Sequence, residues 1–145
     1  DMAVYKFTKK IAAGEQIALH GKGELLRDFT YIDDVVEAIL LVVEQPPMDG
    51  YDGFVTPAKS QVPYRILNVG RGQPVSVKEL VEIIEATLGK RAKVSYEPAH
   101  LADLHITHAD VQDLEETFGF RPNTGLREGI GHFINWFQSY HTDEK

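Results

Sequence analysis

Residues 27–39 read Arg27-Asp28-Phe29-Thr30-Tyr31-Ile32-Asp33-Asp34-Val35-Val36-Glu37-Ala38-Ile39, and this stretch decides the fold class. A strand is predicted from Leu25 to Ile32, where the chain is bounded by a glycine-rich turn on one side. Asp33 and Asp34 follow where a helix should begin, because carboxylates there accept free backbone N–H groups and complement the helix dipole. The helix itself is predicted over residues 35–44. A strand that leads into a capped helix favours mixed α and β structure.

The segments before this stretch continue the same alternation of elements. Residues 2–13 have apolar side chains at helical spacing, and Gly14 is placed to end that helix. Residues 16–20 form a short apolar segment that predicts a strand, and residues 21–24 predict a turn. The N-terminal part therefore predicts a helix, a strand and a turn before the quoted stretch.

The segments after it predict further short elements. Residues 45–63 are rich in Pro, Gly, Asp and Ser, so we expect a long loop there. Ser76 and Glu79 have the spacing of a capping box, which predicts a helix that ends at Gly89. The other expected elements are strands at 64–69 and 92–96, an irregular segment at 97–106, a short helix from Thr107 to Gly119, and a final helix capped by Thr124.

The final helix has an apolar stripe that needs a partner surface. The stripe consists of Leu126, Ile130, Phe133, Ile134, Phe137 and Tyr140. Because Trp136 and the Phe residues also lie at core spacing, we interpret them as core residues. The fold class is therefore predicted as α/β (mixed α+β), with about five helices and four or five short strands.

Composition excludes several classes of protein. The 145 residues contain 15 Lys plus Arg and 22 Asp plus Glu, which gives a formal net charge of −7, and they contain no cysteine. This length suits one domain, and the acidic balance argues against a nucleic-acid partner. The longest apolar run, Ala38 to Val43, is far shorter than the roughly 18 residues that span a membrane. Since no signal peptide is visible either, we expect a cytoplasmic protein without a membrane partner.

The sequence lacks the motifs of several common reaction centres. The sequence has no GxxxxGK[ST] loop, no GxSxG elbow and no GxGxxG, so the chain by itself is not expected to hold NAD. His100, Asp103, His105 and His108 form a local cluster, but their spacing matches no metal motif, and we predict no metal site. Arg27 after the glycine turn is a candidate ligand for phosphate or carboxylate, or else one half of a surface ion pair with Asp28.

Several ordered segments resemble one family, the NAD-dependent nucleotide-sugar epimerases and dehydratases of the extended short-chain dehydrogenase/reductase type. The resemblance covers nearly the whole chain, and within the family it is greatest to the UDP-glucuronate 4-epimerases. The segments are Asp1-Met2-Ala3, residues 27–39, Asn68-Val69-Gly70, Thr107-His108-Ala109-Asp110, Gly119-Phe120-Arg121-Pro122-Asn123-Thr124 and Trp136-Phe137.

The resemblance implies that residues 1–145 are a single substrate-binding domain from the C-terminal part of such an enzyme. The N-terminal NAD-binding Rossmann domain, with its Tyr-x-x-x-Lys pair, would then be absent from this chain. Tyr5 and Lys9 have that spacing, but the resemblance places them after the catalytic helix. We therefore expect no catalytic and no cofactor-binding residue here, NAD only in the complete protein, and no activity from this chain alone.

The resemblance also implies which residues would hold a UDP-sugar. Backbone groups of Ala18 and His20 would pair with uracil, with the His20 ring where an aromatic group often stacks. Arg27 would meet the diphosphate, and Asp103 would hold a ribose hydroxyl or a neighbouring arginine. His100 stands where the family has a second phosphate-binding arginine, so that contact would be a weaker, pH-dependent cation.

The function implied is that of a 4-epimerase acting on UDP-glucuronate and UDP-galacturonate by transient oxidation at C4. A related UDP-sugar decarboxylase or 4,6-dehydratase is a second possibility, and a stand-alone binding or interaction module without chemistry is a third. The expected partners are a UDP-sugar, the missing Rossmann domain and further copies of the protein. We also expect an exposed apolar face where the Rossmann domain would dock.

Overall fold

The computed structural model describes residues 2–47, 57–59, 63–99 and 103–142. These residues form five α-helices and four short strands, so the predicted mixture of α and β structure is confirmed. They divide into two compact units, which are described separately below. Unit 1 comprises residues 1–29, 73–107 and 125–145, and unit 2 comprises residues 30–72 and 108–124.

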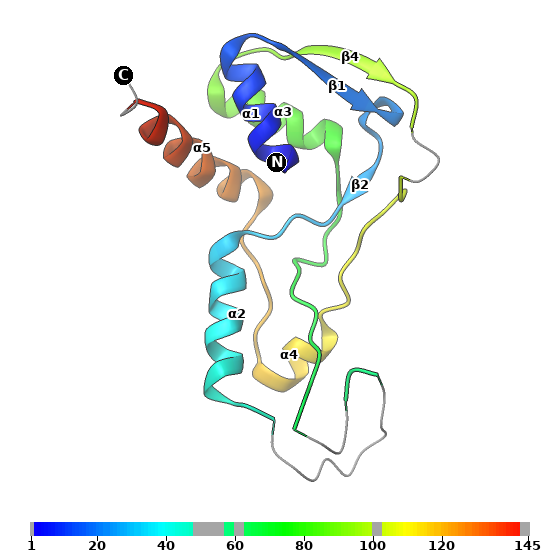
Figure 1. Ribbon diagram of the computed structural model, residues 1–145, viewed down its shortest axis with the longest axis vertical. Helices are drawn as coiled ribbons and strands as arrows, with labels where there is room; N and C mark the ends of the chain where they lie inside the picture. The colour runs from blue at the N-terminus through cyan, green and yellow to red at the C-terminus, as the bar shows by residue number, and fades with distance from the viewer. Residues whose placement is uncertain (1, 48–56, 60–62, 100–102, 143–145) are drawn as a thin grey trace. The chain divides into compact units, whose positions relative to one another are not determined.

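Unit 1 is built on two parallel strands with helices packed beside them (Figure 1). Strand β1 (Gln16–His20) pairs with β4 (Lys93–Glu97) from Gln16 opposite Lys93 to His20 opposite Glu97. The helices of this unit are α1 (Ala3–Ala13), α3 (Val77–Leu88) and α5 (Leu126–Thr142). Buried apolar side chains of these helices and of β1 form one core, made of Ile11, Ile17, Leu19, Leu80, Val81, Ile83, Ile84, Ile130 and Ile134.

The local signals in unit 1 predicted most of these elements. Helix α1 ends at Gly14 in the left-handed conformation, and β1 has the predicted bounds. The Ser76 hydroxyl accepts a hydrogen bond from the Glu79 backbone N–H at 3.0 Å, so the predicted cap of α3 is confirmed. Gly89 ends α3, also as predicted.

A second sheet in unit 1 is very short. Strand β2 (Leu26–Arg27) pairs antiparallel with β3 (Val75–Ser76), and β3 was not predicted. The predicted strand over residues 25–32 is wrong in its extent. The Tyr31 carbonyl already accepts a hydrogen bond from the Val35 N–H, and helix α2 begins at Ile32. The apolar residues before the helix therefore pair for only two positions.

Unit 2 contains α2 (Ile32–Glu44) and α4 (Gln112–Phe118), joined by irregular segments. Asp33 and Asp34 lie in the first turn of α2, but its N-cap is Tyr31, and no side chain caps it. The Asp34 carboxylate instead accepts hydrogen bonds from the Thr124 backbone N–H at 3.0 Å and from the Thr124 hydroxyl at 2.7 Å. Asp34 is therefore a tertiary contact within unit 2, and its predicted role as a cap is wrong.

Three further expectations differ from the structure. Residues 64–69 lie outside every named strand, and only Arg65 forms an isolated bridge, with Lys59. Helix α4 begins at Gln112 and not at Thr107, although Gly119 ends it as predicted. Trp136 is half exposed and not a core residue, and it stacks on Tyr140 at the surface of α5.

Candidate functional site

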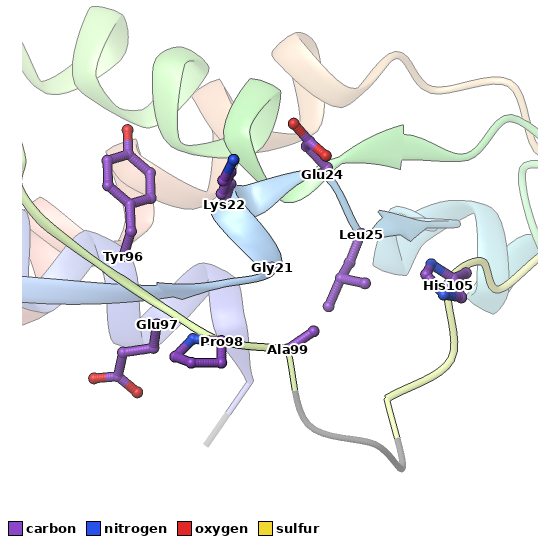
Figure 2. A pocket seen from close by; sticks show the side chains of 9 residues that line it. All are labelled: Gly21, Lys22, Glu24, Leu25, Tyr96, Glu97, Pro98, Ala99 and His105. Atoms are coloured by element: carbon purple, nitrogen blue, oxygen red, sulfur yellow. The ribbon is translucent and has the colours of Figure 1, made fainter.

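The paired strands of unit 1 end together beside a pocket. His20 is the last residue of β1 and Glu97 the last of β4, and the two are in register. Loops that follow the carboxyl ends of parallel strands commonly bind ligands. The pocket there has a volume of about 600 Å³ (Figure 2), and it is lined by Gly21, Lys22, Glu24, Leu25, Tyr96, Glu97, Pro98, Ala99 and His105.

The turn after β1 sets the shape of this pocket. Gly21, Lys22 and Gly23 all have positive φ angles, of 55°, 58° and 77°. The positive φ favours glycine at position 21, and an added Cβ would lie 3.3 Å from the Ala99 Cβ, which is a tight contact. Lys22 adopts the left-handed conformation without being glycine, at a cost of about 1–2 kcal/mol. The fold thus maintains a strained turn that places a lysine at the pocket.

The polar groups of the pocket carry both signs of charge. Figure 2 shows Leu25 and Ala99 pointing toward one another, while the side chains of Lys22 and Glu97 point in opposite directions. The Nδ1 atom of His20 lies 3.6 Å from the Glu97 carboxylate and 3.4 Å from the Pro98 carbonyl oxygen. A mixed lining of this kind suits a polar ligand with several hydrogen-bonding groups.

Arg27 lies in β2, next to Leu26, whose backbone is hydrogen-bonded to His105 and Thr107. The Leu26 N–H donates to the His105 carbonyl at 2.9 Å, and the Thr107 N–H donates to the Leu26 carbonyl at 3.2 Å. The Nη1 group of Arg27 donates to the Leu26 and Leu104 carbonyl oxygens, both at 2.8 Å. Both acceptors are backbone carbonyl oxygens, so these bonds fix the position of the guanidinium. These two carbonyl oxygens hold Nη1, and not the Asp28 carboxylate that the sequence offered as an alternative partner.

The structure places the predicted site residues in two groups within unit 1. Ala18 and His20 lie on β1, with Ala18 opposite Ser95. Arg27 lies beside the segment that contains Asp103, which is half-buried. His100 lies outside the described residues. Lys22, Tyr96 and His105 were not predicted as site residues, and the signal that could have found them is the parallel pairing of the two predicted strands.

The predicted histidine cluster forms no metal centre among the described residues. Over residues 2–47, 57–59, 63–99 and 103–142, no three His, Asp or Glu side chains are grouped as metal ligands would be. His108 lies in unit 2, with its Nε2 atom 3.3 Å from the Gly72 carbonyl oxygen.

Among the residues that the structure describes, no helix has the length and apolar character needed to cross a bilayer.

The chain is similar in sequence to one family model and to several known proteins. Residues 2–133 match the family model described as GDP-mannose 4,6 dehydratase. Protein CapI of Staphylococcus aureus is 39% identical over 144 residues, covering 97% of this chain and 43% of that protein. A protein of Rhizobium meliloti named "Probable UDP-glucuronate 4-epimerase" is 37% identical over 147 residues, covering 97% of this chain and 42% of that protein.

A solved structure shows the same fold. MoeE5 in complex with UDP-glucuronic acid and NAD has a TM-score of 0.77 and 34% identity, covering 97% of this chain and 42% of that one. This chain thus spans about two fifths of the length of the relatives that it matches. The match to the family model extends over most of the chain. The chain therefore belongs to the GDP-mannose 4,6-dehydratase family of NAD-dependent epimerases and dehydratases.

Proposed function

We propose that this chain is the C-terminal, substrate-binding part of a UDP-sugar 4-epimerase that interconverts UDP-glucuronate and UDP-galacturonate. The observation that carries the proposal is the Arg27 guanidinium, which two neutral carbonyl oxygens hold in place. An arginine fixed in this way is suited to a diphosphate, because a guanidinium can bind phosphate oxygens through two parallel hydrogen bonds. Its location beside residues 104–107 places it in the same unit as the pocket.

The remaining assignments rest on the resemblance to the nucleotide-sugar epimerases. Backbone groups of Ala18 and His20 on β1 pair with the uracil, and Asp103 binds a ribose hydroxyl. His100 is proposed to contact the second phosphate. Because Lys22 and His105 line the pocket at the strand ends, they are additional candidates for contacts to the nucleotide.

The residues of this chain do not fit a dinucleotide site. Gly70-Arg71-Gly72 has no third glycine at the required spacing, and the element that follows is strand β3 and not a helix. When bound to the remainder of the complete protein, NAD would supply hydride transfer at C4 of the sugar. This chain contributes binding and orientation of the substrate and neutralisation of its phosphates. We accordingly propose that a Rossmann domain precedes it, and that the complete protein is a homo-oligomer.

The test is calorimetric titration of the complete protein with UDP. Arg27→Ala is expected to weaken UDP binding by about 10- to 100-fold, since a hydrogen bond to a charged group contributes about 1.5–3 kcal/mol. The matched control is Arg91→Ala, because Arg91 is an exposed arginine that pairs with Glu85 and is not among the residues that line the pocket. An affinity that is the same in Arg27→Ala as in the unmodified protein would contradict the phosphate assignment.

Product analysis separates the possible activities. Incubation of the complete protein with UDP-glucuronate is expected to give UDP-galacturonate with no loss of carbon dioxide. Release of carbon dioxide would indicate a decarboxylase, and a 4-keto-6-deoxy product from a UDP-hexose would indicate a dehydratase. If UDP binds but no sugar is converted, the chain belongs to a binding module.

A further inference from the structure

Basic side chains gather at the end of unit 1 where β1 and β4 begin, which is also where α1 and α3 end (Figure 1). The Lys90 Nζ group, just after α3, donates to the Ala12 carbonyl in the last turn of α1 at 2.5 Å. Lys93, the first residue of β4, lies opposite Gln16, the first residue of β1. Five basic residues from these elements make up what we call the basic end: Lys9, Lys10, Lys90, Arg91 and Lys93.

The charge of the basic end is only partly neutralised. All five side chains belong to exposed residues, and Arg91 pairs with Glu85 through Nη1 and Oε2 at 3.1 Å. Among the residues that the structure describes, no acidic side chain pairs with Lys9, Lys10 or Lys93. The C-terminal ends of α1 and α3 each carry about half a negative charge, which attracts cations. Because this is less than the charge of the three unpaired lysines, the basic end stays positive.

The basic end contrasts with the rest of the chain. It holds five of the 15 Lys and Arg residues of a sequence whose formal net charge is −7, so the remainder is more acidic than the whole. Strands β1 and β4 have five residues each, a length of about 16 Å. Exposed charges are screened beyond about 8 Å at physiological ionic strength. Acidic groups at the pocket end of the strands therefore lower the potential at the basic end only slightly.

Exposed apolar and aromatic side chains lie beside these lysines. Met2 is 78% exposed, and about two helical turns separate it from Lys9, which places both on the same side of α1. Tyr5 of the same helix contacts rings of α5 at centroid distances of 5.7 and 6.5 Å. On α5, Trp136 and Tyr140 are half exposed and stack at 5.3 Å. Tyr and Trp side chains favour the boundary between water and lipid.

We propose that the basic end is a docking surface for an anionic lipid bilayer, to which the complete protein binds reversibly. The lysine ammonium groups attract lipid phosphates, and the neighbouring Met2 and Trp136 side chains contact the headgroup layer. The sequence predicted no membrane partner because it lacks a spanning segment, but a peripheral contact needs none. The pocket of unit 1 lies at the opposite end of β1 and β4, so docking leaves it open to soluble ligands.

Nucleic acid is the other large polyanion that lysines could bind. Domains that bind nucleic acid are basic over a whole face or as a whole, because the phosphates extend along the polymer. This chain is acidic, and its unpaired lysines are confined to one end of unit 1. Charge complementarity over a small area with exposed aromatic side chains nearby therefore favours a lipid surface.

Cosedimentation of the complete protein with vesicles tests the proposal. Binding is expected to vesicles of phosphatidylglycerol and phosphatidylcholine, and not to vesicles of phosphatidylcholine alone. It should be lost at about 1 M salt, where the Debye length falls to about 3 Å. Absence of binding to the anionic vesicles at about 0.1 M salt would overturn the proposal. Binding to duplex DNA without binding to these vesicles would also overturn it, in favour of a nucleic-acid partner.

The location of the surface is tested with a pair of double variants. Lys9→Gln/Lys10→Gln removes two charges from the basic end, and Lys78→Gln/Arg127→Gln removes two from exposed helical positions elsewhere in unit 1. Glutamine keeps a similar helix propensity. Each lysine near an anionic surface raises the partition coefficient about fivefold, so the first variant should lower it about 25-fold and the second less than about threefold. Equal losses would overturn the proposal, because only net charge would then matter.

A third variant and a ligand titration complete the test. Lys93→Gln on β4 should lower the partition coefficient about fivefold, and an unchanged value would contradict a surface that includes both α1 and β4. UDP affinity is expected to be the same in Lys9→Gln/Lys10→Gln as in the unmodified protein, which also shows that the variant is folded. Since UDP binding depends on Arg27 and vesicle binding on the basic end, the proposed function and this docking surface can each fail alone.

Discussion

Helices α2 and α3 have nearly the same length, 13 and 12 residues, and both are rich in aliphatic side chains. In α3 the aliphatic residues Leu80, Val81, Ile83 and Ile84 are at most 5% exposed, because β1 and the neighbouring helices cover them. In α2 much of the aliphatic surface faces outward. The comparison teaches that two aliphatic helices of similar length differ in burial: the apolar side of α3 is enclosed in a core, whereas Ile39, Leu40 and Val43 of α2 are exposed among the described residues.

The two helices also differ in how their ends are capped. Helix α3 begins with a hydrogen bond from the Glu79 N–H to the Ser76 hydroxyl and ends at Gly89 in the left-handed conformation. Helix α2 begins after Tyr31 without a side-chain cap and ends at Gln45 with a φ of −130°. Local signals thus delimit α3, whereas α2 depends on its packing to define where it begins and ends.

The largest expected effect comes from truncating a leucine in each helix. Leu80→Ala in α3 should lower the free energy of unfolding of unit 1 by about 2–5 kcal/mol, because it leaves a cavity in a closed core. Leu40→Ala in α2 should change the stability of the 145-residue chain by less than about 0.5 kcal/mol, because Leu40 is already exposed. Urea denaturation followed by amide exchange in each helix measures both. Equal costs for the two variants would remove the contrast between the helices.

A smaller effect is expected on the inner side of α2, where Asp34 holds Thr124. Asp34→Ala removes the acceptor of two hydrogen bonds at a position that is 7% exposed. It should destabilise unit 2 by about 1.5–3 kcal/mol, the usual contribution of hydrogen bonds to a charged group. Amide exchange in α2 and at Thr124 should increase accordingly.

The control for this prediction is Asp33→Ala, one residue earlier in the same helical turn. Asp33 is exposed, so its removal should cost only the interaction with the helix dipole, about 0.5 kcal/mol. If Asp33→Ala destabilises α2 as much as Asp34→Ala does, the contact with Thr124 contributes nothing beyond a charge near the helix start.

The sequence predicted those elements whose signals are local. Helix α3 was predicted with its cap and its C-terminal glycine because Ser76, Glu79 and Gly89 act within one turn of their own helix. The segment 64–69 has an equally clear strand pattern, but a strand exists only where another strand pairs with it. The prediction was wrong there because an alternating pattern shows that a segment can pair as a strand, whereas among the described residues only Arg65 of this segment forms a bridge.

The candidate site was predicted in part for a similar reason. Arg27 was singled out from its place after a glycine turn, and the structure shows it fixed by backbone carbonyls. Lys22 and Tyr96 line one pocket because β1 pairs with β4, whose residues are more than 70 positions away in the sequence, and His105 joins them because its carbonyl accepts a hydrogen bond from the Leu26 N–H. Spacing within one segment carries no information on such a pairing, and the roles of all these residues stay predictions.

The smallest expected effect concerns the residue that follows each helix, Gly89 after α3 and Gln45 after α2. Gly89 has a φ of 64°, and a Cβ added there would have no atom within 4 Å. Gly89→Ala therefore lowers the free energy of unfolding through backbone conformation and not through a clash, by about 1 kcal/mol. Gly89→Asn should lower it less, because asparagine adopts the left-handed conformation more readily. Gln45→Ala at the end of α2 should cost almost nothing, because Gln45 has a negative φ that alanine adopts freely. Thermal unfolding with amide exchange at Lys90, whose N–H donates to the Glu85 carbonyl, measures the effect on α3. Equal costs at the two positions would mean that the end of α3, like that of α2, is set by packing and not by its glycine.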